Sequence, residues 1–430
     1  MQTHKKGLMM EEISVIGAGF VGSAHAIFLS KHYKTVNLID KNESLINKLQ
    51  SGILDFDSSD ARLKKEFHSG LYNNIILPSN NISKIKSSKI IFISIGFDFV
   101  EDDNGFENLT KLFEDIIKFC NKNCLLVLET TVPPGTSEKV IIPILNQNAN
   151  EKNINYVYSY ERVMPGSNYL KSIEELPKVY SGINKQSIKI YNGHLERVGS
   201  NLKHTLLKNI ISAETSKVFE NTYRMMNIAI IQEFTEFASK VGVDLPTILD
   251  SIRVRPTHSN IRYAGMAPGG YCLTKDPSFL KKSSELIKFQ FDFPILEATS
   301  KIINRQNSFI LKYLTEFIEL EKNYFFLGLT YLPGIGDFRN SSSMWIYRKL
   351  LKYGYNIKPV DSFWNEISQI SNNVSIKKEN AILATRHPEF TFDYLKKFKL
   401  IIDINSNLSY EEKKDLRNHN IVIFQYGEYA

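Results

Sequence analysis

The stretch Ile13-Ser-Val-Ile-Gly-Ala-Gly-Phe-Val-Gly22 decides how the first part of this chain folds. A short apolar run leads into three glycines at the spacing GxGxxG, and a helical pattern follows. In that context the first glycine permits a tight turn, the second lets a pyrophosphate approach the backbone, and the third allows the helix to pack closely on the strand. The free N–H groups of the helix then face the phosphate. We assign to a dinucleotide site Gly17, Gly19, Phe20, Val21 and Gly22.

An acidic residue follows where such a site needs one. Asp40 ends the second apolar run, Thr35–Asp40, about 20 residues after the glycines. A carboxylate there accepts hydrogen bonds from the ribose hydroxyls and repels a 2′-phosphate, so NAD is expected rather than NADP. Lys41 weakens that preference.

Further apolar runs without clean alternation predict buried parallel strands with helices on both faces. They are Lys89–Gly96, Leu125–Thr131, Asn155–Glu161 and Val179–Ile183 in the first half, and five more from Tyr324 onward. Between the halves, Lys208–Val241 has the apolar period of one helix, roughly 50 Å long. The predicted fold class is therefore α/β, with two doubly wound Rossmann-like domains joined by a central helical domain. The expected domains are 1–200, 201–310 and 311–430.

Composition excludes several classes of protein. With 43% hydrophobic and 23% charged residues in 430, the chain is not disordered, collagen-like or a coiled coil. No apolar run is long enough to cross a membrane, and the first ten residues lack the apolar stretch of a secretory signal. Three cysteines make no disulfide framework, so a cytoplasmic location is expected. The net charge of +7 suits an anionic small molecule, but the scattered lysines predict neither a nucleic-acid nor a membrane partner.

A possible nucleophile lies in Gly269-Gly-Tyr-Cys-Leu-Thr-Lys-Asp-Pro277. Two glycines let a backbone come close to a ligand, and a thiolate at Cys272 with Lys275 nearby is able to attack an electrophile. The alternative is that Cys272 is a buried small hydrophobe. Asp276 and Pro277 have an alternative interpretation, in which Asp276 caps the N-terminus of a helix and Pro277 is the first residue of that helix.

Polar groups recur at two other places. Lys217, Asn221 and Arg224 share one helix face, which suits an anionic or hydroxylated ligand or, alternatively, is a solvated edge. Thr131 and Glu161 follow two predicted strands, at the edge where open parallel sheets bind ligands. Glu161 is a candidate base, or ordinary turn polarity.

The order of these pieces resembles the UDP-glucose/GDP-mannose dehydrogenase family of NAD-dependent nucleotide-sugar 6-dehydrogenases. The matching stretches are VIGAGFVG, LETTVPPGTSE, ERVMPG, AETSKVFENTYRMMNIAIIQE, GGYCLTKDP and GLTYLPGIGDFRNSS, over about residues 13–343. The resemblance implies an NAD-binding domain, a central domain that supplies a homodimer interface, and a C-terminal domain that binds a UDP-sugar. It also implies a four-electron oxidation of the C6 hydroxyl in a cleft between the two sheets.

The resemblance further implies roles for single residues. Cys272 forms a thiohemiacetal and then a thioester, and Glu161 with Asp276 or Thr131 holds the water that hydrolyses it. Lys217 and Asn221 stabilise the developing negative charge on oxygen. Thr131 and Arg339 join the cofactor site, and no metal is expected. The substrate is expected to contact Glu161, Arg162, Lys217, Asn221, Arg262, Gly269, Gly270 and Lys275.

Departures from the family pattern indicate a divergent subgroup. Phe97-Asp98 stands where the family usually has Thr-Pro. Tyr160 and Thr274 each stand where it usually has a proline, and Ala267 stands where it often has a glycine. The length of 255–266 is closer to the branch that oxidises N-acetylhexosamines than to the UDP-glucose branch. Two other functions stay open: a two-electron β-hydroxyacid-type dehydrogenase, and a non-catalytic nucleotide-sugar-binding homologue.

Overall fold

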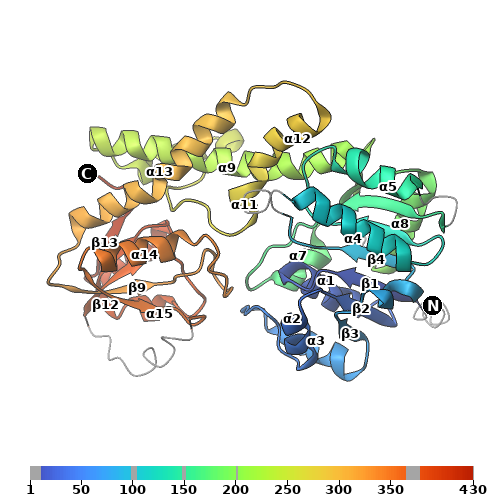
Figure 1. The fold of residues 1–430 in the computed structure, drawn as a ribbon. Coiled ribbons are helices and arrows are strands. Elements are labelled where there is room, and N and C mark those ends of the chain that lie inside the picture. The colour runs from blue at the N-terminus through green and yellow to red at the C-terminus, as the bar shows by residue number, and fades with distance from the viewer. Residues whose placement is uncertain (1–10, 98–103, 148–151, 200–201, 365–377, 430) are drawn as a thin grey trace. The chain divides into compact units, whose positions relative to one another are not determined.

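A computed structural model describes residues 11–97, 104–147, 152–199, 202–364 and 378–429 (Figure 1). The chain divides into two compact units. The first unit contains residues 1–220 and 278–291, and the second contains 221–277 and 292–430. Asp98, which the sequence analysis singled out, lies outside the described residues.

The first unit is built on an eight-stranded sheet with the order β3-β2-β1-β4-β5-β6-β7-β8. Its strands are β1 Glu12–Ile16, β2 Thr35–Ile39, β3 Ile76–Ser79, β4 Ile90–Ile93, β5 Leu125–Leu128, β6 Asn155–Ser159, β7 Val179–Gly182 and β8 Thr205–Leu206. Strands β1 to β6 are parallel, whereas β7 runs antiparallel to β6. The order reverses at β1, which places the glycine loop at the switch point where ligands bind.

Helices cover this sheet because their apolar residues pack on its buried strands. They include α1 Phe20–Leu29, α2 Glu43–Gln50, α3 Ala61–Tyr72, α4 Gly105–Phe119, α5 Ile142–Gln147, α7 Tyr169–Glu175 and α8 Lys185–Arg197. Helix α12, Phe279–Ile287, instead packs beyond the strand ends, where Phe279 contacts Phe97 and Ser283 bonds to Pro134. Helix α1 is buried from Gly22 to Leu29, since small side chains let it lie flat on the sheet.

The long helix α9, Ile210–Val241, confirms the predicted single helix. The boundary between the two units falls inside it, after Glu220. Shorter helices follow: α10 Leu245–Arg253, α11 Cys272–Lys275 and α13 Pro294–Phe317. Asp244 caps the N-terminus of α10, because its carboxylate accepts a hydrogen bond from the backbone N–H of Thr247.

The second unit contains a five-stranded parallel sheet with the order β10-β9-β11-β12-β13. Its strands are β9 Asn323–Leu327, β10 Asn356–Val360, β11 Glu379–Leu383, β12 Phe398–Asp403 and β13 Val422–Gln425. The helices α14 Ser342–Lys352, α15 Phe392–Leu395 and α16 Tyr410–Asn418 connect them. All five strands were predicted, and the two-sheet α/β fold class is confirmed. The division into three domains stays a prediction.

Among the described residues, no helix combines the length and the apolarity that crossing a membrane requires.

Candidate active site

The glycine loop has the geometry that a dinucleotide needs. Gly17 has φ +97°, and a Cβ there would stand 2.3 Å from the carbonyl oxygen of Ser94. A Cβ on Gly22 would lie 1.8 Å from the oxygen of Gly17. Gly19, by contrast, has nothing within 4 Å of that position and caps the N-terminus of α1. The first and third glycines are therefore required by the fold, and Gly19 leaves room for a phosphate at the helix N-terminus. These residues fit NAD.

Asp40 lies just after β2 and holds the glycine loop. Its Oδ2 accepts a hydrogen bond from the N–H of Ala18 at 2.8 Å, and its Oδ1 accepts one from Asn42 at 2.9 Å. Each carboxylate oxygen keeps a second lone pair for a ribose hydroxyl. The predicted place of Asp40 beside the cofactor loop agrees with this geometry.

The ends of β4 and β5 are tied together beside that loop. Thr130 Oγ1 accepts a hydrogen bond from the N–H of Ile95 at 3.0 Å. Thr131, the next residue and a predicted catalytic and cofactor contact, is half-buried at the same strand end. Phe97, which replaces the usual threonine, is buried and packs edge-on against Phe106 and Phe279, at centroid distances of 5.8 and 5.9 Å. The substitution therefore fills an apolar cluster.

Glu161 follows β6 and is held through both carboxylate oxygens. Its Oε1 accepts a hydrogen bond from the N–H of Arg162 at 3.1 Å, and its Oε2 pairs with the ammonium of Lys178. Both Glu161 and Lys178 are buried, with 8% of each residue exposed. Sequence reasoning proposed Glu161 but missed its partner.

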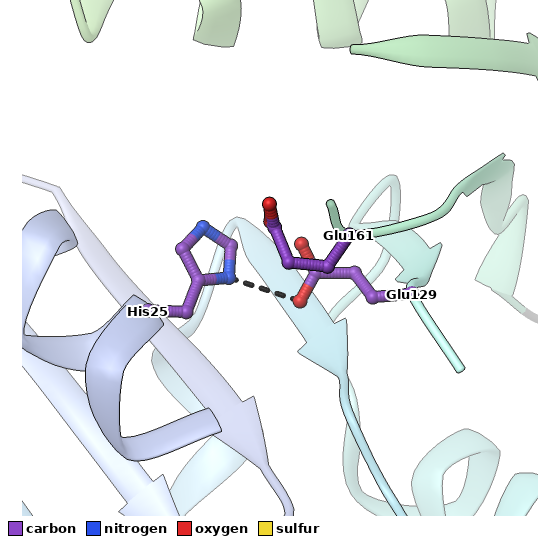
Figure 2. Close-up of side chains that lie close together, drawn as sticks. All are labelled: His25, Glu129 and Glu161. Carbon is purple, nitrogen blue, oxygen red and sulfur yellow. Dashed lines mark hydrogen bonds and ion pairs between the residues drawn. The ribbon is translucent and has the colours of Figure 1, made fainter. Parts of the chain in front are cut away.

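A second buried pair lies beside Glu161 (Figure 2). His25 Nδ1 is 2.9 Å from Glu129 Oε2, and the hydroxyl of Ser94 donates to the same oxygen at 2.5 Å. Burial raises the pKa of Glu129, but the charge and hydrogen bond of His25 outweigh burial and lower it below its usual value. His25 and Glu129 were also missed. A lone histidine in an apolar helix gives no signal, although Glu129 stands inside the quoted LETTVPPGTSE stretch.

His25, Glu129 and Glu161 offer donor atoms within 4.8 Å of one another, the spacing of a metal site. The ammonium of Lys178 already supplies a positive charge at Glu161, so a divalent cation would have to compete with it. The expectation that the protein holds no metal stays a prediction.

Lys217 is buried near the same strand end. Its Nζ lies 5.2 Å from the centroid of the Tyr160 ring, a cation–π distance. The Tyr160 hydroxyl contacts Ser216 Oγ at 3.1 Å and receives a hydrogen bond from Arg162 at 3.0 Å. Burial raises the pKa of Tyr160. The tyrosine that replaces the usual proline therefore helps to place both Lys217 and Arg162.

The cysteine loop belongs to the second unit. Cys272 is exposed at the start of α11, so the alternative of a buried hydrophobe is wrong. A Cβ on Gly269 would lie 2.6 Å from Tyr331, and one on Gly270 2.7 Å from its ring. The N–H of Gly270 also bonds to the carbonyl oxygen of Arg339 at 2.9 Å. Both glycines are thus needed to press the loop against Tyr331.

Asp276 is completely buried next to this loop. Its Oδ2 accepts a hydrogen bond from Asn221 Nδ2 at 2.6 Å, and its Oδ1 from Lys275 Nζ at 2.8 Å. Asp276 ends α11 and does not cap a following helix, so the N-cap interpretation is wrong. The structure instead brings together three of the predicted residues.

Arg339 faces the same loop. It forms a two-point ion pair with Asp337, with Nη2–Oδ2 at 2.6 Å and Nε–Oδ1 at 2.9 Å. This hydrogen bonding raises the pKa of Arg339, and Cys272 acts in the same direction. The guanidinium carbon lies 5.8 Å from the ring centroid of Tyr271.

A pocket of about 380 Å³ opens in the second unit. Its wall includes Arg253, Asn260, Arg262 and Asn405. Burial and the nearby charge of Arg224 lower the pKa of Arg262. Within the described ranges, neither Arg224 nor Arg262 is paired with a carboxylate. Two neighbouring guanidinium groups without an acidic partner suit a phosphate-bearing ligand.

Comparisons with known proteins agree with this geometry. Residues 11–195 match the NAD binding domain of the UDP-glucose/GDP-mannose dehydrogenase family, and 211–305 match its central domain. The chain is 27% identical to a UDP-N-acetyl-D-mannosamine dehydrogenase of Methanococcus vannielii, over 98% of this chain and 96% of that protein. It is also 27% identical to a UDP-glucose 6-dehydrogenase of Rickettsia bellii, over 83% and 82%. The solved UDP-D-ManNAc dehydrogenase of Pyrococcus horikoshii has the same fold, with a TM-score of 0.76, 23% identity and coverage of 97% and 99%.

Proposed function

The chain belongs to the UDP-glucose/GDP-mannose dehydrogenase family and is an NAD-dependent nucleotide-sugar dehydrogenase. We propose that its substrate is a UDP-N-acetylhexosamine and that UDP-N-acetyl-D-mannosamine is the preferred one. The sugar C6 hydroxyl is oxidised to the carboxylate in two steps. Relatives named for this sugar align over nearly the whole chain, which favours it over UDP-glucose. The exposed thiol of Cys272, in a loop anchored beside Asp276 and Arg339, is the observation that carries the proposal.

Each step of the proposed chemistry is assigned to a named side chain. NAD, when bound at the glycine loop, accepts one hydride in each oxidation. The C6 hydroxyl gives up its proton to an ordered water, and Lys217 donates a hydrogen bond to the C6 oxygen and stabilises its developing negative charge. The thiolate of Cys272 adds to the C6 aldehyde, and this thiohemiacetal is oxidised to a thioester. The buried amide of Asn221, held by Asp276, supports the same oxygen.

Hydrolysis completes the reaction. Glu161 takes a proton from water as the water attacks the thioester carbon, and Thr131 orients that water. The C–S bond breaks, the uronic acid leaves, and the Cys272 thiol is restored. A cysteine suits this sequence because it keeps the reactive aldehyde bound between the two oxidations.

Recognition of the diphosphate is assigned to the second unit. Arg262, with Arg224 near it and Arg253 in the same pocket wall, provides positive charge for a diphosphate. Gly269, Gly270 and Lys275 hold the loop that faces the sugar. Arg162 lies beside Glu161 and completes the sugar contacts.

The protein is proposed to form a homodimer through α9. Large apolar side chains on this helix are exposed and recur at spacings of three, four and seven residues, which puts them on one stripe. They are Phe219, Tyr223, Ile230, Phe234, Phe237 and Val241. A stripe of this kind marks a protein–protein contact.

A panel of sugars tests the substrate. UDP-N-acetyl-D-mannosamine, UDP-N-acetyl-D-glucosamine, UDP-glucose and GDP-mannose are each mixed with the protein and NAD, and absorbance of NADH is followed. We expect the highest kcat/KM with UDP-N-acetyl-D-mannosamine. Higher kcat/KM for UDP-glucose contradicts the substrate assignment. No NADH with any sugar supports instead a binding protein that has lost turnover.

A further inference from the structure

We propose that Lys178 is the positioning residue for Glu161, holding its carboxylate in the orientation that accepts the proton of the hydrolytic water. The inference rests on the proposed role of Glu161 as the base. Lys178 itself does not touch the substrate, and acts through the ion pair with Glu161 Oε2.

The register of the sheet places the two residues opposite each other. Strands β6 and β7 pair antiparallel, with Val157 opposite Gly182 and Ser159 opposite Tyr180. Two residues beyond the Ser159–Tyr180 pair, the same register places Glu161, which follows β6, opposite Lys178, which precedes β7. Directly opposed side chains on antiparallel strands lie close enough to interact. The antiparallel pairing of β7 with β6 therefore brings a cation to the candidate base.

Lys178 is fixed by its backbone on the far side. Its N–H donates to His204 Nδ1 at 3.0 Å, and its carbonyl oxygen accepts from the N–H of Thr205 at 2.9 Å, which begins β8. The side chain is thus delivered from a rigid strand. The carboxylate is equally constrained, because the N–H of Arg162 holds its other oxygen.

Charge explains why a lysine is needed there. Two buried carboxylates, Glu129 and Glu161, lie next to each other with His25, and the positive charge of Lys178 also lowers the pKa of Glu129. Without Lys178 the two carboxylates, with His25 beside them, would repel each other in a buried site. The carboxylate of Glu161 would then no longer be held in the orientation that accepts a proton from water.

The test compares Lys178→Met, Lys178→Arg, Glu161→Gln and the double variant Glu161→Gln/Lys178→Met. We expect Lys178→Met to lower kcat about 10- to 100-fold with KM for the UDP-sugar and NAD little changed, because positioning and not binding is lost. Lys178→Arg keeps the charge and should restore most of kcat. Intact-mass spectrometry during turnover should show the sugar thioester accumulating on Cys272 in Lys178→Met, a signature that loss of stability alone does not produce.

The double variant decides whether Lys178 acts through Glu161. If it does, adding Lys178→Met to Glu161→Gln lowers kcat no further. The inference would be overturned if the two substitutions lowered kcat independently, so that their effects multiplied in the double variant, or if Lys178→Met had a normal kcat. If Lys178→Met fails to fold, the double variant, which removes both charges, and Lys178→Arg give the same answer. The control is Lys171→Met, which breaks an exposed Lys171–Glu175 pair at 3.8 Å and should leave kcat unchanged.

Failure of the base assignment is distinguishable. Normal kcat in Glu161→Gln contradicts the proposed role of Glu161 and the inference with it. If kcat falls in Glu161→Gln but is normal in Lys178→Met, the proposed function stands and only the positioning role of Lys178 is rejected.

Discussion

Cys272 differs from the other two cysteines of the chain in its surroundings. Cys120 and Cys124 are buried next to β5, whereas Cys272 is exposed on a loop that glycines press against Tyr331. A nucleophile must reach its electrophile, and only Cys272 meets that requirement among the three cysteines.

Replacing the nucleophile should separate binding from turnover. In Cys272→Ser the alcohol is a weaker nucleophile than a thiolate and a poorer leaving group, so we expect net uronic acid formation to fall at least about 100-fold. NAD affinity, measured by fluorescence titration, should stay unchanged. Cys120→Ala is the control and should turn over normally. Acid formation by Cys272→Ser at the wild-type rate would contradict a covalent intermediate.

Glu214 gives a pH prediction. It is buried on α9 and accepts hydrogen bonds from the N–H groups of Gly135 and Ser137 at 2.6 and 2.8 Å. Burial raises its pKa to about 7, although those hydrogen bonds oppose the shift. Between pH 4.5, the ordinary pKa of a glutamate, and about pH 7, Glu214 is therefore protonated in the folded protein but ionised in the unfolded chain. The contribution of Glu214 to the free energy of unfolding is fully present below pH 4.5 and is lost as the pH rises to about 7.

Glu214→Gln should remove that dependence. From pH 5 to pH 8 the free energy of unfolding of the wild type should fall relative to the variant, by on the order of 3 kcal/mol. Urea titrations at the two pH values measure it. Parallel pH profiles for the two proteins would show that Glu214 titrates normally.

At the residue scale, the sequence singles out candidate chemical groups but not the residues that hold them in place. Glu161, Asn221 and Asp276 stand in recognisable stretches. Their partners are less visible, because Lys178 meets Glu161 only through the register of β6 and β7, and His25 meets Glu129 only after α1 has folded on the sheet. Such pairings depend on tertiary structure that no local spacing encodes.

At the scale of elements, the turn into α1 separates glycines needed for folding from one needed for binding. Gly19→Ala puts a Cβ into open space at a φ of −74°, which alanine adopts without strain. We expect an unchanged Tm and NAD affinity about 10-fold weaker, because the methyl group occupies the phosphate position. Gly22→Ala collides with the Gly17 oxygen and should lower Tm by several degrees. Thermal unfolding with NAD titration measures both, and an undiminished NAD affinity in Gly19→Ala would contradict the assigned phosphate position.

Most strands were predictable because buried parallel strands are apolar on both faces. Strand β3 was missed, since it is four residues long and contains Pro78, and β8 was missed because it has only two residues. The direction of β7 could not be predicted, because an apolar run is the same for either direction and the connection alone decides it.

At the scale of the whole molecule, α9 leaves apolar surface uncovered. Phe234→Glu/Phe237→Glu puts two charges into the exposed stripe of that helix. If the stripe is a dimer interface, size-exclusion chromatography with light scattering should show the wild type as a dimer and the variant as a monomer. Tyr72→Glu, at an exposed aromatic residue of α3, is the matched control and should remain dimeric. A monomeric wild type would contradict the proposed interface.

The central claim is that one protein carries a sugar alcohol through two oxidations to an acid while holding it on Cys272. The most direct test is the ratio of NADH formed to UDP-N-acetyl-D-mannosamine consumed, measured by absorbance and chromatography in one reaction. We predict two NADH for each sugar, with the UDP-linked uronic acid as the product. One NADH for each sugar, with an aldehyde released, would contradict the account.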